Sequence, residues 1–114
     1  MKYAQLDRLK STSVRNGVTR RVFTGEGATL AWTTLEPGHT PFPHSHPYEQ
    51  IVYVVSGQLR FTVGSDVAEL CAGDMIVVPP GVEHFAETLG SEPALDLSIF
   101  TPRRDDYAAQ ERLS

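Results

Sequence analysis

Three histidines and one glutamine stand at spacings that suit a metal site. His44, His46 and Gln50 occupy even-numbered positions in the segment GHTPFPHSHPYEQ, and an apolar run follows at once. Because alternate side chains of a strand share a face, we expect these three to point one way at the entry of a strand. His84 follows a second apolar run and a Pro-Pro-Gly turn. Three imidazoles and an amide suit one divalent metal ion, and Zn, Ni, Mn and Fe all tolerate this donor set.

Two neighbouring residues compete with this assignment. Glu49 carries a carboxylate, which binds metal ions more strongly than an amide, but its odd-numbered position faces it away from His44 and His46. His39, the remaining histidine, falls outside the spacing. We therefore predict that Gln50 is the fourth ligand and that His39 is a loop residue.

Short apolar or alternating runs, separated by glycine and proline, predict strands at intervals of about ten residues. The expected strands cover residues 18–23, 29–35, 51–55, 58–63, 66–71, 75–78, 84–88 and 94–100, after an arm and edge strand in residues 1–16. The only helical candidate is a short polar segment, residues 105–112. An α+β domain would need a longer helix, so the pattern predicts an all-β sandwich or barrel.

The last expected strand has one apolar and one polar face. These faces consist of Leu95, Leu97 and Ile99 and of Asp96, Ser98 and Phe100. Taken alone, the strand would be expected to turn its polar face to solvent. A barrel with a wet ligand cavity predicts the opposite arrangement, in which the polar face lines the lumen and a dimer partner covers the apolar face.

Length and composition exclude several classes of function. A chain of 114 residues fits one domain, spanning residues 1–114. The net charge of -4 and isolated Arg-Arg pairs give no basic surface for nucleic acid. No apolar run approaches the roughly 20 residues that span a bilayer. With one cysteine and no leader-like start, we expect a soluble cytoplasmic protein without nucleic-acid or membrane partners.

The first motif resembles that of the cupins, small jelly-roll β-barrels. Cupins carry a glycine, five residues, His-x-His, three or four residues, an acid, six residues and a glycine. The matching residues here are Gly38, His44, His46, Gln50 and Gly57. Gln50 stands where the family usually has glutamate.

The second cupin motif follows with the same spacing as in the family. It is matched by Gly73, the turn of residues 79–81, His84 and Thr88, which replaces a frequent asparagine. The resemblance implies a jelly-roll barrel, one divalent metal ion, a small-molecule substrate and homodimers. It leaves the reaction open, because the superfamily hosts many chemistries.

A narrower resemblance combines HSHPYEQ with the C-terminal FTPRRDDY segment. Both look like the small cupins of pectin and alginate breakdown that open the ring of unsaturated uronates. Those proteins carry Asp-x-Phe-x-x-x-Arg, which supplies an acid/base group, a packing ring and a substrate-binding arginine. Phe100 and Arg104 match, Ser98 takes the aspartate position, and Asp96 lies two residues earlier on the same face. A surface Arg104 paired to Asp105 or Asp106 is the alternative.

The expected function is metal-assisted chemistry on a small carboxylated or sugar-acid substrate, by isomerisation or ring opening. A neutral Gln50 leaves the metal its full charge, which favours a Lewis-acid role. Phe42 and Tyr48 are expected at the mouth of the pocket and Trp32 inside the barrel, with plain packing as the alternative for each. The competing functions are a cupin dioxygenase acting on a phenolic or diketone substrate, and a non-catalytic small-molecule binder.

Overall fold

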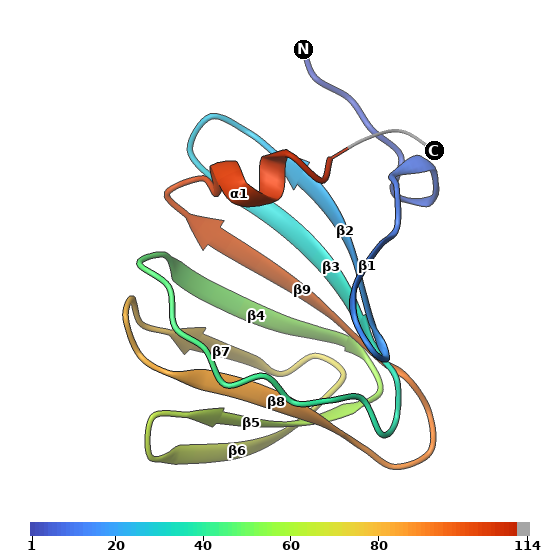
Figure 1. Cartoon of the computed structure of the whole chain (residues 1–114), viewed down its shortest axis with the longest axis vertical. Helices are drawn as coiled ribbons and strands as arrows, with labels where there is room; N and C mark the ends of the chain where they lie inside the picture. The colour runs from blue at the N-terminus through green and yellow to red at the C-terminus, as the bar shows by residue number, and fades with distance from the viewer. Residues whose placement is uncertain (112–114) are drawn as a thin grey trace.

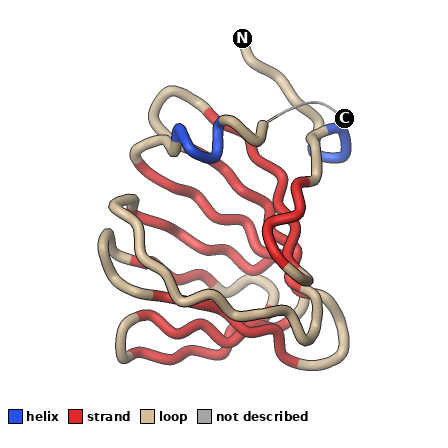
Figure 2. Tube along the Cα trace, in the orientation of Figure 1, coloured by secondary structure: helices blue, strands red, loops and turns tan. Residues whose placement is uncertain are grey.

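The computed structural model describes residues 1–111 and shows two antiparallel β-sheets. The larger sheet has the order β1-β2-β3-β9-β4-β7 and the smaller one has the order β6-β5-β8 (Figure 1). The strands are β1 Thr12–Arg15, β2 Val18–Thr24, β3 Thr29–Leu35, β4 Glu49–Ser56, β5 Gln58–Val63, β6 Asp66–Cys71, β7 Met75–Val78, β8 His84–Leu89 and β9 Ala94–Thr101. The two helical pieces are η1 Leu6–Arg8 and α1 Asp105–Ala108 (Figure 2). This confirms the all-β prediction.

Two predicted elements differ from the structure. We expected His44 and His46 at the start of a strand, but they lie in the long loop that precedes β4, and only Gln50 belongs to the strand. Pro43 and Pro47 flank the histidines and have no N–H to donate to a sheet, which explains why regular pairing begins only at Glu49. The predicted helix ends at Ala108 instead of residue 112, which lies outside the described residues.

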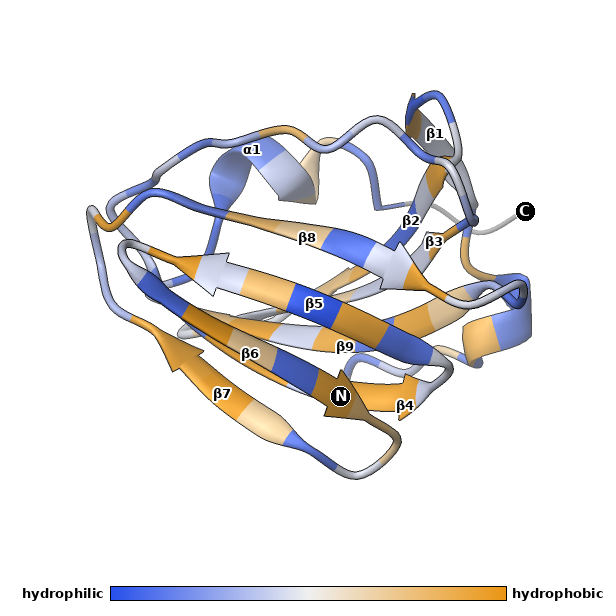
Figure 3. Ribbon diagram, turned by 90° about the horizontal axis from the view of Figure 1, so that it is seen from below, coloured by the Kyte–Doolittle hydropathy of each residue, from blue (hydrophilic) through white to orange (hydrophobic). Residues whose placement is uncertain are grey.

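The core fills the space between the two sheets. β4 alternates strictly, with Gln50, Val52 and Val54 buried and their neighbours exposed, as expected for a strand with one face on a core. Seen from below in Figure 3, the smaller sheet lies over the larger one, with apolar positions recurring along each strand. The buried cluster consists of Val18, Leu35, Val52, Val54, Leu59, Phe61, Leu70, Val78 and Ala94.

The polar face of β9 points inward. Asp96 and Ser98 are only 5% and 3% exposed, whereas the apolar residues on the other face are partly exposed. The reason is topological, because β9 lies between β3 and β4 in the middle of the larger sheet and its inner face is covered. The expectation drawn from the strand alone, that these polar groups face solvent, is wrong.

Trp32 does not pack inside the barrel. On β3 the residues Ala31 and Thr33 line the central cavity, so Trp32 between them faces outward, where it borders a surface depression with Leu95. The expectation that Trp32 packs inside the barrel is wrong, and Trp32 does not line the cavity described below.

No helix in residues 1–111 is long and apolar enough to cross a membrane.

Candidate metal centre and its cavity

The backbone brings the two histidine motifs together. His44 and His84 form an antiparallel bridge, with His44 N–H donating to the His84 carbonyl at 3.1 Å and His84 N–H donating to the His44 carbonyl at 2.9 Å. Gly81 N–H donates to the carbonyl of His46 at 2.8 Å from a turn in which φ is +78°. Only glycine adopts that conformation readily, so the Pro-Pro-Gly turn fixes the loop against β8.

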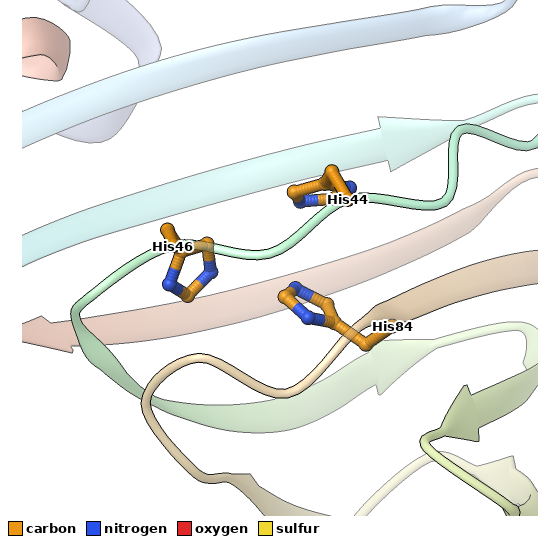
Figure 4. A group of neighbouring side chains, drawn as sticks. All are labelled: His44, His46 and His84. Carbon is orange, nitrogen blue, oxygen red and sulfur yellow. The ribbon is translucent and has the colours of Figure 1, made fainter.

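Each of the three imidazoles is oriented by a backbone carbonyl. The Nδ1 atoms of His44, His46 and His84 lie 2.6, 3.0 and 2.9 Å from carbonyl oxygens two residues away. A carbonyl only accepts, so each Nδ1 carries the proton and each Nε2 keeps a free lone pair. Ligand nitrogens of the three rings lie within 4.8 Å of one another, and Figure 4 shows the rings gathered between the loop and β8.

Gln50 adds a fourth electron pair. Its Nε2 donates to Ser98 Oγ at 2.9 Å, which turns Oε1 toward His46 Nε2 at 3.1 Å. With the His46 proton on Nδ1, these facing atoms are both acceptors, and two acceptors at that distance repel each other unless a cation or proton lies between them. His84 Nε2 is also buried without a partner. The residues therefore fit one divalent cation.

The charge state of the rings favours the same conclusion. Burial, the largest influence, lowers the pKa of His84 to about 4 and also lowers the pKa of His44, and nearby histidines act in the same direction. At neutral pH these rings are uncharged, so protons do not compete for their lone pairs. Imidazole and amide ligands carry no negative charge, so they would leave the charge of a bound ion undiminished.

A cavity of about 70 Å³ opens beside the triad. The predicted residues that line it are Phe42, His44, Gln50, His84, Asp96, Ser98 and Phe100. This volume accommodates a molecule of few atoms or one end of a larger one. Phe42 is exposed at the side of the loop and stacks on His44 with ring centres 5.4 Å apart, as expected for a residue at the mouth.

Asp96 lies at the end of a hydrogen-bond chain that begins at the triad. Ser98 Oγ, which accepts from Gln50, donates to Asp96 Oδ1 at 3.3 Å. Burial raises the pKa of Asp96 to about 7, and the Ser98 hydrogen bond and Arg20 offset part of that effect. A carboxyl group that changes its protonation near neutral pH can donate or accept a proton during a reaction.

Arg104 occupies a structural position beside the cavity. Its Nε and Nη2 donate to the two carboxylate oxygens of Asp106 at 3.1 and 2.7 Å, which is the aspartate pairing given above as the alternative, although Arg104 is buried and does not lie on the surface. The guanidinium carbon lies 3.6 Å from the ring centre of Tyr107 and 4.8 Å from that of Tyr48. Arg104 is buried, and its Nη1 has no partner, but neither Arg104 nor Tyr48 lines the cavity.

Sequence reasoning missed several residues of the cavity wall, among them Arg15, Arg20 and Tyr107. The available signal was the alternation of β2, where Arg20 shares a face with the buried Val18 and Val22. His39 lies in the loop as predicted, yet it is buried, and its Nε2 accepts from the Thr88 N–H at 3.3 Å.

Sequence comparison identifies one relative that matches over nearly its whole length and another that matches over only part of its length. An uncharacterized protein of Streptomyces coelicolor is 28% identical over 103 residues, which cover 90% of this chain and 97% of the relative. Oxalate decarboxylase OxdC of Bacillus subtilis is 37% identical over 90 residues, which cover 74% of this chain and 23% of that enzyme. The chain thus spans about a quarter of the decarboxylase.

Two solved structures have the same fold as this chain. An RmlC-like cupin from Shewanella frigidimarina superimposes with a TM-score of 0.85 over 94% of this chain and 96% of that one, at 23% identity. KdgF from a Halomonas species superimposes with a TM-score of 0.78 over 85% of this chain and 89% of its own, at 28% identity. The family description "cupin domain" matches residues 31–100. On this match, and with the jelly-roll sheets and three-histidine cluster described above, the chain belongs to the cupin family.

Proposed function

We propose that this cupin is a metal-dependent enzyme that moves a proton on a small carboxylated molecule. The observation that carries the proposal is the chain of contacts from His46 through Gln50 and Ser98 to Asp96, at 3.1, 2.9 and 3.3 Å. It joins the four ligand side chains to a carboxyl group whose pKa lies near 7, and His44, Gln50, His84 and Asp96 line one cavity. The sequence pattern and the geometry thus support the same four ligands.

The residues of the site have different roles in the proposed reaction. A divalent ion held by His44, His46, Gln50 and His84 would act as a Lewis acid on a carbonyl or enol oxygen of the substrate. Asp96 donates a proton to the substrate or accepts one from it. Ser98 orients both the carboxyl group of Asp96 and the side-chain amide of Gln50 through its hydrogen bonds. Phe100 packs its ring edge-on against His46 with centres 5.5 Å apart, which keeps water from that side of the site. The role of Arg104 as a substrate ligand stays a prediction.

The specific reaction to test is ring opening of an unsaturated uronate. The motif resemblance supports it, although Ser98 takes the aspartate position of that pattern. Asp96, two residues earlier and hydrogen-bonded to Ser98, would supply the acid/base group instead. Metal-loaded protein should remove the enol absorbance of an unsaturated uronate. Asp96→Asn should lower kcat by about 100-fold or more, the usual contribution of a general acid or base.

The matched control is Asp66→Asn, which changes an exposed aspartate at the start of β6 and should leave turnover unchanged. If metal-loaded wild-type protein fails to consume the uronate, ring opening is wrong. If Asp96→Asn retains full turnover, the assignment of the proton to Asp96 is wrong.

A second candidate is oxidation or decarboxylation of a small carboxylate. The similarity to oxalate decarboxylase favours it, although this chain corresponds to only part of that enzyme. Oxygen uptake or carbon dioxide release with oxalate would identify this chemistry. The neutral amide of Gln50 favours the first candidate, because a negatively charged ligand better stabilises a higher oxidation state of the metal. A non-catalytic binder would instead show ligand binding that Gln50→Ala weakens, without turnover in either protein.

We also propose a homodimer formed through the outer face of the larger sheet. Ile51, Tyr53, Met75 and Val77 on β4 and β7 are exposed, with Met75 65% and Val77 55% accessible. Contiguous exposed apolar side chains of this kind mark association surfaces. Light scattering should give twice the chain mass, and Val77→Asp should yield a monomer of unchanged fold. A wild-type mass of one chain would refute the dimer.

A further inference from the structure

Two arginines face the cavity from the side of β1 and β2. Arg20 shares the inner face of β2 with Val18, and Arg15 ends β1 where the register shifts after Ser13. A bulge of this kind re-aims the side chain that follows it. Both arginines line the same cavity as His44, His84 and Asp96.

The guanidinium groups of Arg15 and Arg20 form hydrogen bonds and ring contacts with uncharged groups. Arg20 lies 4.0 Å from the ring centre of Tyr107 and donates weakly to Gln110 Oε1 at 3.4 Å. Arg15 donates from Nε to the Thr40 carbonyl at 2.9 Å, and its guanidinium carbon lies 5.5 Å from the ring centre of Phe42. Within residues 1–111, no carboxylate oxygen forms an ion pair with either arginine.

Arg104 differs in this respect, because its charge is already offset by both oxygens of Asp106. The cations facing the cavity, in contrast, lose hydration without forming an ion pair within residues 1–111, and the charges of Asp96 and Asp106 act on Arg20 only from a longer distance. Burial lowers the pKa of both Arg15 and Arg20, although each stays charged at any ordinary pH. Unpaired, partly desolvated guanidinium groups have a high affinity for a planar carboxylate, which accepts two parallel hydrogen bonds.

We propose that Arg15 and Arg20 form a carboxylate-binding subsite that holds the acid end of the substrate against β1 and β2. This inference rests on the proposed function and narrows its substrate class. Both arginines line the same small cavity as His44 and His84, so one substrate molecule can contact both groups. The substrate is therefore a small acid that has a carbonyl, hydroxyl or enol oxygen in addition to its carboxylate.

The test compares pyruvate with pyruvamide, which have nearly the same size and differ in charge. Binding to the purified full-length chain is followed by amide chemical shifts, first as purified and then with EDTA. Wild-type protein should bind pyruvate at least tenfold more tightly than pyruvamide in both conditions. Arg20→Gln should weaken pyruvate binding about tenfold or more and leave pyruvamide binding unchanged, since the fork donors are lost and the neutral ligand never used the charge.

Arg21→Gln is the matched control. Arg21 is the next residue on β2, has the opposite parity and donates to the Leu6 carbonyl on the outer surface. The Arg21→Gln variant should bind pyruvate and pyruvamide with the same affinities as wild type. Arg15→Gln provides a second variant of the subsite in case Arg20→Gln disturbs the packing of Tyr107, and it should also weaken pyruvate binding selectively.

Equal losses in Arg20→Gln and Arg21→Gln would overturn the subsite, because they would reflect only the general surface charge. Equal binding of pyruvate and pyruvamide by wild-type protein would also overturn it. The outcome is independent of turnover. A protein that leaves unsaturated uronates untouched but shows the charge preference refutes ring opening and retains the subsite, whereas active enzyme without the preference refutes only the subsite.

Discussion

Asp96→Asn offers a thermodynamic test of the cavity that requires no substrate. Burial raises the pKa of Asp96 to about 7 from its usual 3.8. Below about pH 4 both the folded and the unfolded chain hold the proton. Between the two pKa values the folded chain holds a proton that the unfolded chain has lost, so the free energy of unfolding falls as pH rises. Above about pH 7 both are ionised and the decline stops.

The size of the effect follows from the same pKa values. Each pH unit in the window costs about 1.4 kcal/mol, so Asp96 should cost the wild-type chain about 2 kcal/mol between pH 5.5 and pH 8. Asparagine does not titrate, and its side-chain oxygen can still accept the hydrogen bond from Ser98. The stability difference between wild type and Asp96→Asn should therefore shift by that amount in favour of asparagine at the higher pH.

The assay is urea unfolding of both proteins in EDTA at several pH values, because a bound cation would itself lower the pKa of Asp96. Other titrating groups cancel in the difference between the two proteins. Asp66→Asn, which changes an exposed carboxylate, should follow wild type at every pH. If the stability difference between wild type and Asp96→Asn stays constant from pH 5.5 to pH 8, Asp96 has no raised pKa and the reasoning about the cavity fails.

Two further substitutions test the fold and the fourth ligand. Gly57→Ala should lower the free energy of unfolding by about 3 kcal/mol or more in urea titrations, because φ is +80° and the new Cβ would lie 2.6 Å from Ala94 Cα. Gly73→Ala, at a φ of +93° in open space, should cost only about 1 kcal/mol, and equal losses would contradict the argument from backbone contact. Gln50→Glu should tighten metal binding at least tenfold in chelator competition, since a carboxylate offsets the charge of the ion, and unchanged affinity would remove Gln50 from the ligand set.

Much of the fold can be predicted because its strands alternate clearly. On β5 the apolar residues Leu59, Phe61 and Val63 share one parity, and Leu59 and Phe61 are buried as that pattern predicts. On β4 the sequence places Gln50 on the face of Val52 and Val54, but Ile51 to Val55 are apolar on both faces, so the sequence alone does not say which face is buried. β3 has apolar residues on both faces, with Leu30 and Trp32 on one and Ala31 on the other. Parity then gives no answer, and the outward direction of Trp32 depends on which face the second sheet covers.

The acid/base group and the cationic wall depend on contacts between distant segments. Asp96 has a raised pKa only because β3 and β4 flank it and the smaller sheet covers it, which no local pattern shows. Arg20 shares its parity with Val18 and Val22 and Arg21 does not, but a charged side chain is usually assigned to solvent whatever its parity. The pairing of β1, β2 and β3 shows that the face of Arg20 is the one turned to the cavity.

The central claim is that His44, His46, Gln50 and His84 together bind one divalent ion, and metal content tests it most directly. Wild type, His84→Ala and His39→Ala would be purified without added metal, checked for folding by circular dichroism, and analysed for Zn, Ni, Mn and Fe. Wild type and the His39 control should hold close to one ion per chain, and His84→Ala should hold little, because one of four ligands is lost. A folded His84→Ala protein with as much metal as wild type would contradict the account, as would a wild-type chain that takes up none of the four metals.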